Sequence, residues 1–214
     1  MKKYLKRLEN EVEQNVDEQL EEQGIKESDF MQMIMDEINS KTLNIMGEFN
    51  DEMVAFVREF ASKLWYYEAD TSRPLYINIT SHGGYLNALM AILDILQDLK
   101  DEWGCTIITN CTGYAESCGF ILWCFGDKRC MGKYGELMTH YIKYNWQGTP
   151  EDHEKELKRT KRMQDKVDEI ICEKTSLTKK QLRAWYKKGD TFIDYKKAKE
   201  LGLLTIGEEE KPNE

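Results

Sequence analysis

Hydrophobic and polar positions follow two alternating periods along most of the chain. After about residue 42, short runs rich in β-branched and aromatic residues alternate with longer stretches whose apolar residues recur every three or four positions. The runs predict strands at 43–46, 75–79 and 106–111, near Arg129, and at 137–141. The stretches predict helices at 52–67 and 86–96, after Ser117, at 150–173, and between Asp194 and Gly202. This order, with few polar residues in the strands, predicts an α/β domain with a largely parallel sheet covered on both faces.

Residues 1 to 40 differ in character from the rest. Eleven acidic and five basic residues give this segment six of the nine net negative charges of the chain. A narrow apolar stripe from Leu5 to Leu20 predicts an amphipathic helix ending at Gly24, and Ser28 is the predicted N-cap of a second short helix. Such a stripe needs a partner surface; a partly frayed appendage is the alternative. The predicted division is an acidic helical segment 1–40, a domain 41–207 and an acidic tail 208–214.

Length, charge and cysteine usage exclude several classes of protein. A chain of 214 residues, 41% of them hydrophobic, can bury one core, and a net charge of -9 argues against a nucleic-acid partner. No apolar run approaches the ~20 residues that a bilayer requires, and the charged start has no apolar signal core behind it, so we expect a cytoplasmic protein without a membrane partner. The six cysteines lack zinc spacing, which predicts reduced core thiols and no metal site.

Two strand-to-helix turns carry the candidate chemistry, because ligands of open α/β sheets bind beyond the carboxyl ends of the strands. The turn at 79–84 contains Gly83 and Gly84, which let backbone N–H groups approach a developing oxyanion, although paired glycines more often mark only a tight turn. The turn at 111–119 contains Ala115-x-Ser117-x-Gly119, a relaxed nucleophile elbow. A helix N-cap is the alternative role of this serine.

A nucleophilic serine needs a base, and the chain has three histidines. His140 follows a strand at its carboxyl end, where a catalytic base would lie. His82 belongs to the glycine turn, and His153 lies on a charged helix face. The acid that would orient the base stays open at this point, since Asp190, Asp194 and several glutamates are candidates.

Five motifs, in this order and spacing, resemble the proteolytic subunit of the Clp protease, ClpP. They are the stretch Leu75 to Gly84, the turn Cys111 to Gly119, the pair Lys128-Arg129, Met138-x-His140, and Asp190-x-Phe192 followed by Ala198-x-x-x-Gly202-Leu203. The resemblance covers about residues 43 to 206. It is that of a divergent member, of the kind a phage or prophage would carry.

The resemblance implies a set of site residues. Ser117 corresponds to the nucleophile, His140 to the general base and Asp190 to the acid that orients it. The backbone N–H groups of Gly84 and Cys118 correspond to the oxyanion hole. The implied activity is that of an ATP-dependent Clp protease proteolytic subunit, a serine endopeptidase that cuts unfolded proteins or peptides.

The resemblance also implies architecture and partners. It implies a ClpP/crotonase-like fold with 150–173 as the handle helix, and heptameric rings stacked in pairs around a chamber. It further implies an AAA+ unfoldase partner. The chain has no P-loop, so we expect no cofactor of its own and ATP hydrolysis only by that partner.

Two departures from the family motifs keep other functions open. His82 stands where the family has a proline, and Glu116 stands where it has a small residue before the serine. A carboxylate facing the pocket would oppose the oxyanion. A catalytically inactive ring or scaffold subunit is therefore one alternative. An acyl-CoA enzyme of the wider crotonase fold is another, because fold alone does not fix chemistry, and the unusual first 40 residues leave a phage capsid-maturation protease open.

Overall fold

The computed structural model describes residues 32, 35, 36, 38–67, 69, 70, 72–145 and 147–206. The chain divides into two compact units, Met1–Ser40 and Lys41–Glu214. The helix predicted to end at Gly24, the N-cap at Ser28 and the tail 208–214 lie outside the described residues. All the strands and long helices that the structure describes belong to the second unit.

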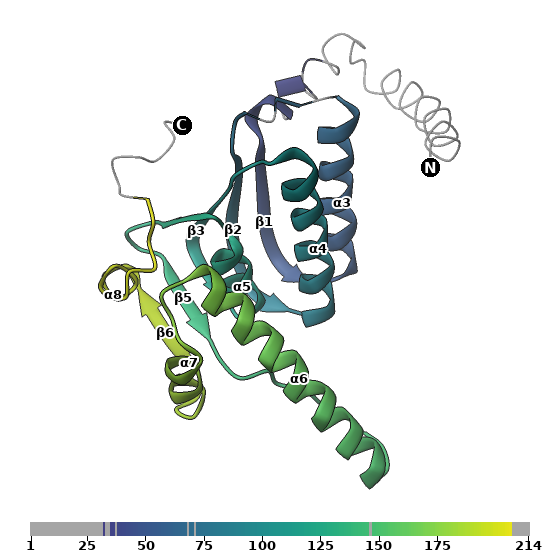
Figure 1. The fold of residues 1–214 in the computed structure, drawn as a ribbon, viewed down its shortest axis with the longest axis vertical. Coiled ribbons are helices and arrows are strands. Elements are labelled where there is room, and N and C mark those ends of the chain that lie inside the picture. Colours follow the sequence, from purple (N-terminus) through teal and green to yellow (C-terminus); the bar gives the residue numbers. More distant parts are fainter. Residues whose placement is uncertain are drawn as a thin grey trace. The chain divides into compact units, whose positions relative to one another are not determined.

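Strands and helices alternate through the second unit, as the hydrophobic pattern predicts (Figure 1). They are β1 (Thr42–Phe49), α3 (Asp51–Tyr66), β2 (Leu75–Gly84), α4 (Leu86–Trp103), β3 (Ile107–Glu116), α5 (Cys118–Phe125), β4 (Lys128–Met131), β5 (Glu136–Thr139), α6 (Pro150–Lys174), α7 (Lys179–Tyr186), β6 (Thr191–Asp194) and α8 (Tyr195–Glu200). Several elements extend further than predicted at their carboxyl ends. Two elements, α7 and β6, have no counterpart in the sequence prediction.

The sheet is mostly parallel. Its strand order is β1-β2-β3-β5-β6, with β4 paired to β3 beside this path. All pairs are parallel except β5 with β6, which is antiparallel. The α/β class and the largely parallel sheet are confirmed.

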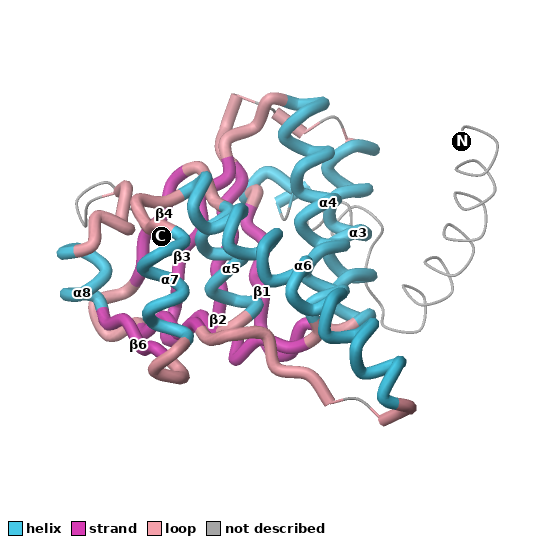
Figure 2. Tube along the Cα trace, turned by 60° about the horizontal axis from the view of Figure 1, so that its bottom comes forward, coloured by secondary structure: helices cyan, strands magenta, loops and turns pink. Residues whose placement is uncertain are grey.

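Helices α3, α4 and α5 lie on the same side of the strands, which the tube view makes visible (Figure 2). Odd-numbered residues of β2, such as Ile77 and Ile79, are fully buried beneath them, whereas the even-numbered residues are partly exposed. On that second face, Asn78 accepts a side-chain hydrogen bond from Asn110 (3.1 Å) and donates one to Asn44 (3.0 Å). The prediction of a sheet covered on both faces is therefore wrong for the described part of the chain, because alternate strand positions are polar.

The long helix α6 confirms the prediction for 150–173. It begins with a capping box in which Thr149 and Asp152 exchange hydrogen bonds, and Pro150 occupies its first turn. Its buried residues begin at the eleventh position of the helix and are Thr160, Gln164, Val167, Asp168 and Ile171. The first half projects from the sheet and its covering helices (Figure 1). None of the helices in the described residues is long and apolar enough to cross a bilayer.

A buried arginine ties the last described segment to the sheet. Arg129 in β4 is 5% exposed; its Nε donates to the carbonyl of Leu203 (3.0 Å) and its Nη1 to that of Gly126 (2.8 Å). The backbone N–H of Thr205 donates to the carbonyl of Arg129 (2.9 Å). One side chain thus satisfies two buried carbonyls and holds the chain beyond α8 against β4.

Replacement of Arg129 with Met should lower the free energy of unfolding by about 2–4 kcal/mol, because two carbonyls lose their donor. Urea denaturation followed by tryptophan fluorescence measures this change. Lys128→Met is the matched control, since Lys128 is the exposed neighbour in the same strand. Equal stability of the two variants would contradict the assigned role of Arg129.

Candidate active site

Ser117 occupies a sharp turn between β3 and α5. Its backbone has φ 52° and ψ −113°, a conformation that residues with a side chain rarely adopt. The turn is held from both sides, because its N–H donates to the carbonyl of Met138 (2.8 Å) and its carbonyl accepts from Ile121 N–H (3.2 Å). The Ser117 side chain makes no capping hydrogen bond to α5. The predicted elbow is therefore present, and the hydroxyl is left for other chemistry.

The glycine turn at the end of β2 packs directly against Ser117. Gly83 has φ +104°, and a Cβ added to it would lie 2.7 Å from the Cβ of Ser117. A Cβ on Gly84, where φ is +148°, would lie 2.5 Å from the carbonyl oxygen of Phe49. Ser81, which is fully buried, accepts a hydrogen bond from Gly83 N–H (3.0 Å) and donates one to the carbonyl of Gly47. Only glycine fits both positions, so the paired glycines are required by this close approach.

The structure brings Ser117 and His140 together. His140 Nε2 lies 3.0 Å from Ser117 Oγ, within hydrogen-bonding distance. His140 Nδ1 lies 2.6 Å from the carbonyl oxygen of Tyr141, which can only accept a hydrogen bond. We assign the proton to Nδ1 on this ground, which leaves Nε2 free to accept the proton of the serine hydroxyl.

Asp190 lies near this pair but is hydrogen-bonded elsewhere. Lys143 Nζ is 3.0 Å from Oδ1 and 3.3 Å from Oδ2 of Asp190, and both side chains are largely exposed. The hydrogen bond from Lys143 holds the pKa of the Asp190 carboxyl below its usual range, and the charge of Lys143 lowers this pKa further. The carboxylate is therefore charged at neutral pH. Its role in orienting His140 stays a prediction, because the carbonyl of Tyr141 holds His140 Nδ1 in this structure.

The two residues implied for the oxyanion hole are in contact. The Sγ of Cys118 donates to the carbonyl of Gly84 (3.3 Å), which joins the two turns. Cys118 is the first residue of α5, so its backbone N–H has no partner within the helix. Burial raises the pKa of the Cys118 thiol to about 11, which keeps the sulfur protonated at neutral pH. The contribution of both N–H groups to an oxyanion hole stays a prediction.

The two departures from the family motifs contact each other. His82 Nδ1 lies 2.8 Å from Glu116 Oε2, and the His82 ring stacks on Tyr114 with centroids 4.1 Å apart. His82 and Glu116 project from β2 and β3 at the positions that follow the paired residues Ser81 and Ala115. They line an open cavity of about 420 Å³ on the polar face of the sheet. The Glu116 carboxylate is therefore paired with an imidazole beside the turns.

The residues that sequence reasoning missed are those that hold His140 and Asp190. Lys143 is 47 positions from Asp190, and no spacing rule connects them. The backbone of Tyr141 carries no chemical signature. Helix α7 did have a signal in the sequence, because Thr178 and Gln181 form a capping box of the Thr-x-x-Gln type.

The cysteine thiols of the described residues are mostly buried. All six cysteines are free, and five of them are buried. Burial raises the pKa of Cys111 to about 12. In the ranges that the structure covers, no group of three or more His, Cys, Asp or Glu side chains is arranged to hold a metal ion.

The pair of His82 and Glu116 joins the two turns, so removing it should slow the reaction of Ser117. His82→Ala and Glu116→Ala should each lower the rate of labelling by a fluorophosphonate about two- to fivefold, the effect of a cross-strand pair. The double variant should be no slower than either single variant. Lys133→Ala, which lines the same cavity, is the control. Faster labelling of Glu116→Ala would show instead that the carboxylate opposes the oxyanion.

Comparisons with known proteins place the chain in a family. The chain matches the family model for the Clp protease over residues 23–208. The match begins before residue 41, where the sequence pattern predicts the start of the domain. The chain is also 30% identical over 169 residues to the ATP-dependent Clp protease proteolytic subunit 2 of Bacillus licheniformis, an alignment that covers 78% of this chain and 85% of that relative. A chain with these matches, an α/β fold and a serine elbow facing a histidine belongs to the Clp protease family.

Proposed function

We propose that this protein is a serine endopeptidase that hydrolyses peptide bonds of unfolded proteins or peptides. The observation that carries the proposal is the distance of 3.0 Å between Ser117 Oγ and His140 Nε2 at a strained turn. Membership in the Clp protease family supports the same activity. A hydroxyl next to an unprotonated imidazole nitrogen is the arrangement that activates a serine nucleophile.

The proposed reaction follows from the positions of these groups. Ser117 Oγ attacks the scissile carbonyl carbon while His140 Nε2 takes the hydroxyl proton. The protonated imidazole then returns the proton to the leaving amine, whose bond to the carbonyl carbon breaks. A water molecule, activated by the same nitrogen, hydrolyses the acyl-enzyme and restores the serine.

The negative charge of the intermediate would be stabilised by the backbone N–H groups of Gly84 and Cys118. Loss of one such donor typically costs about 3 kcal/mol of transition-state stabilisation. Asp190 would orient and stabilise the imidazolium after leaving Lys143. Asp190 is exposed, and an aspartate carboxyl ordinarily ionises far below neutral pH, so a charged carboxylate is available for this role.

The proposal extends to assembly and partners. The name of the relative in Bacillus licheniformis describes an ATP-dependent proteolytic subunit. We propose by analogy that this chain forms heptameric rings stacked in pairs. We further propose that an AAA+ unfoldase delivers polypeptide to it and that it is cytoplasmic. The exposed first half of α6 supports a role of this helix in contacts between subunits, since Leu157 there is 42% exposed.

A catalytically inactive ring or scaffold subunit is the second candidate. It is favoured by one observation, the hydrogen bonds of Asp190 to Lys143 in place of His140. The pair of Glu116 with His82 weakens the other argument for inactivity, because that carboxylate already has a partner. Assembly without hydrolysis is the behaviour that would distinguish this candidate.

Incubation with a fluorophosphonate should add one adduct to the wild-type protein, because only an activated serine reacts at a useful rate. Intact-mass spectrometry measures the adduct. Ser117→Ala should show none, and His140→Ala should react at least about 100-fold more slowly for want of a base. Absence of the adduct on assembled wild-type protein would overturn the proposed activity and favour the scaffold.

Lys143→Met should raise the rate of peptide hydrolysis, because Asp190 would then be free to accept a hydrogen bond from His140. The increase should be at most about fivefold, since an exposed ion pair is worth less than about 1 kcal/mol. The rate constant kcat on a fluorogenic peptide measures the change. Lys158→Met, at an exposed position of α6, is the control. A rate below that of wild type would indicate that Lys143 assists catalysis.

A further inference from the structure

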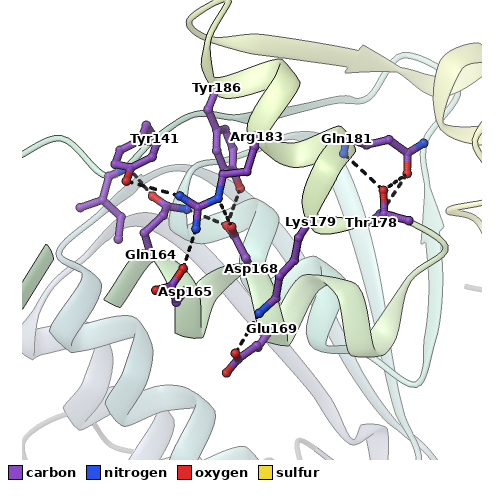
Figure 3. Close-up of polar contacts among 11 residues, drawn as sticks. Tyr141, Gln164, Asp165, Asp168, Glu169, Thr178, Lys179, Gln181, Arg183 and Tyr186 are labelled. Atoms are coloured by element: carbon purple, nitrogen blue, oxygen red, sulfur yellow. Dashed lines mark hydrogen bonds and ion pairs between the residues drawn. The ribbon is translucent and has the colours of Figure 1, made fainter. Parts of the chain in front are cut away.

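A cluster of polar side chains from α6 and α7 lies against the segment that carries His140 (Figure 3). Its members are Gln164 and Asp168 of α6 and Arg183 and Tyr186 of α7, which we call the α6–α7 network. Gln164 and Asp168 are both 0% exposed. Fully buried polar and charged residues are uncommon on a helix whose other half is exposed, and a buried carboxylate lowers stability unless it is compensated.

Asp168 is the centre of the network. Its Oδ1 accepts hydrogen bonds from Gln164 Nε2 (2.8 Å) and from the hydroxyl of Tyr186 (3.2 Å). Arg183 Nε lies 2.7 Å from its Oδ2 and supplies the compensating charge. No aligned hydrogen bond from the described residues reaches Oδ2, so this charge is its main compensation. Burial and the charge of Asp168 raise the pKa of Tyr186, which keeps its hydroxyl a donor.

The outer ends of the network hold the two residues that follow His140. Gln164 Oε1 accepts a hydrogen bond from the backbone N–H of Ile142 (2.9 Å). Arg183 Nη1 donates to the hydroxyl of Tyr141 (3.4 Å), and its guanidinium lies 5.7 Å from the centre of that ring. Tyr186 contacts the Tyr141 ring edge to face, with centroids 5.8 Å apart.

The residue before His140 is held as well. Thr139 is 3% exposed, and its side chain interacts with the hydroxyl of Tyr186. The network thus holds Thr139, Tyr141 and Ile142, while the His140 ring itself is hydrogen-bonded to Ser117 and the Tyr141 carbonyl. The orientation of the imidazole therefore depends on where the network places the backbone of Tyr141.

We propose that the α6–α7 network is the device that positions His140, and that Gln164 and Asp168 are positioning residues for the catalytic base. The inference rests on the proposed function. While Asp190 is paired with Lys143 it contributes little to this positioning, since exposed pairs of that kind are weak and screened by solvent. A buried, hydrogen-bonded network resists displacement, and a misplacement of the base by 1 Å is enough to slow catalysis strongly.

The test removes two hydrogen bonds of the network, one to the His140 segment and one between α6 and α7. Gln164→Met keeps a side chain of similar size but removes the acceptor for the N–H of Ile142. Tyr186→Phe removes only the hydroxyl that donates to Asp168. The matched control is Glu169→Gln, which breaks the ion pair between Lys179 of α7 and Glu169 of α6 (2.9 Å) without a contact to the His140 segment. Figure 3 shows this pair beside the network.

The measured quantities are the second-order rate constant for fluorophosphonate labelling of Ser117 and the separate kcat and KM for a fluorogenic peptide. Gln164→Met should lower labelling and kcat about tenfold with KM unchanged, and Tyr186→Phe should lower them about threefold. Glu169→Gln should stay within about twofold of wild type. If Gln164→Met does not fold, judged by circular dichroism, Tyr186→Phe decides the outcome.

A second comparison shows whether the network acts through His140. On the His140→Ala background, Gln164→Met and Tyr186→Phe should cause no further loss of the slow residual labelling, because the group that they position is gone. An equal loss on both backgrounds would overturn the inference and assign the network to general stability. The inference would also be overturned if wild type is labelled and the network variants are labelled as fast as Glu169→Gln. If wild type itself is not labelled, the proposed function is overturned instead.

Discussion

The pairing of β3 with β5 is the interaction on which the arrangement of the site depends. Glu116 is paired with Met138 in the parallel register, and the next N–H, that of Ser117, donates to the carbonyl of Met138. Both strands therefore end at the same edge of the sheet, and His140 follows two residues after Met138. A shift of one residue in this register would turn every side chain of one strand to the other face. The contact between Ser117 and His140 exists because the register is this one.

The buried structure around the turn stabilises the strained backbone conformation of Ser117. A positive φ at a residue other than glycine costs about 1–3 kcal/mol. All eight residues of α5 are buried, so the helix that begins at this turn cannot move without exposing apolar surface. Gly83 allows β2 to approach the serine closely. The pair of His82 and Glu116 crosses between the same two strands, so the two departures from the family motifs form one feature of the structure.

The surroundings of His140 are organised differently from those of Ser117. Ser117 lies between a strand and a buried helix, both parts of the regular core. His140 lies at the start of an irregular segment between β5 and α6, where no ladder of backbone hydrogen bonds continues. Side chains of α6 and α7 replace that ladder by holding the residues around His140. The long helix therefore contacts the segment around His140 through its second half, while most of its first half is exposed.

The sequence by itself determined the alternation of strands and helices, the long helix from Pro150 and the candidate residues Ser117 and His140. These depend on local periodicity, caps and turn chemistry, which a single stretch of chain contains. Helix α7 carried a readable capping box, but β6 is too short and too mixed to be recognised without its partner β5. The polar face of the sheet was visible in the alternation of β2 yet was outweighed by its apolar residues.

Only the tertiary structure decided which distant groups meet. The contacts of Asp190 with Lys143, of His82 with Glu116, and of Gln164 with Ile142 join residues 47, 34 and 22 positions apart. No periodicity connects such positions, because their distance is set by strand register and by the packing of α6 and α7 on the core. Motif order could therefore identify the family and the candidate residues Ser117 and His140. The orientation of each side chain, and so the partner of each charge, was a property of the folded chain alone.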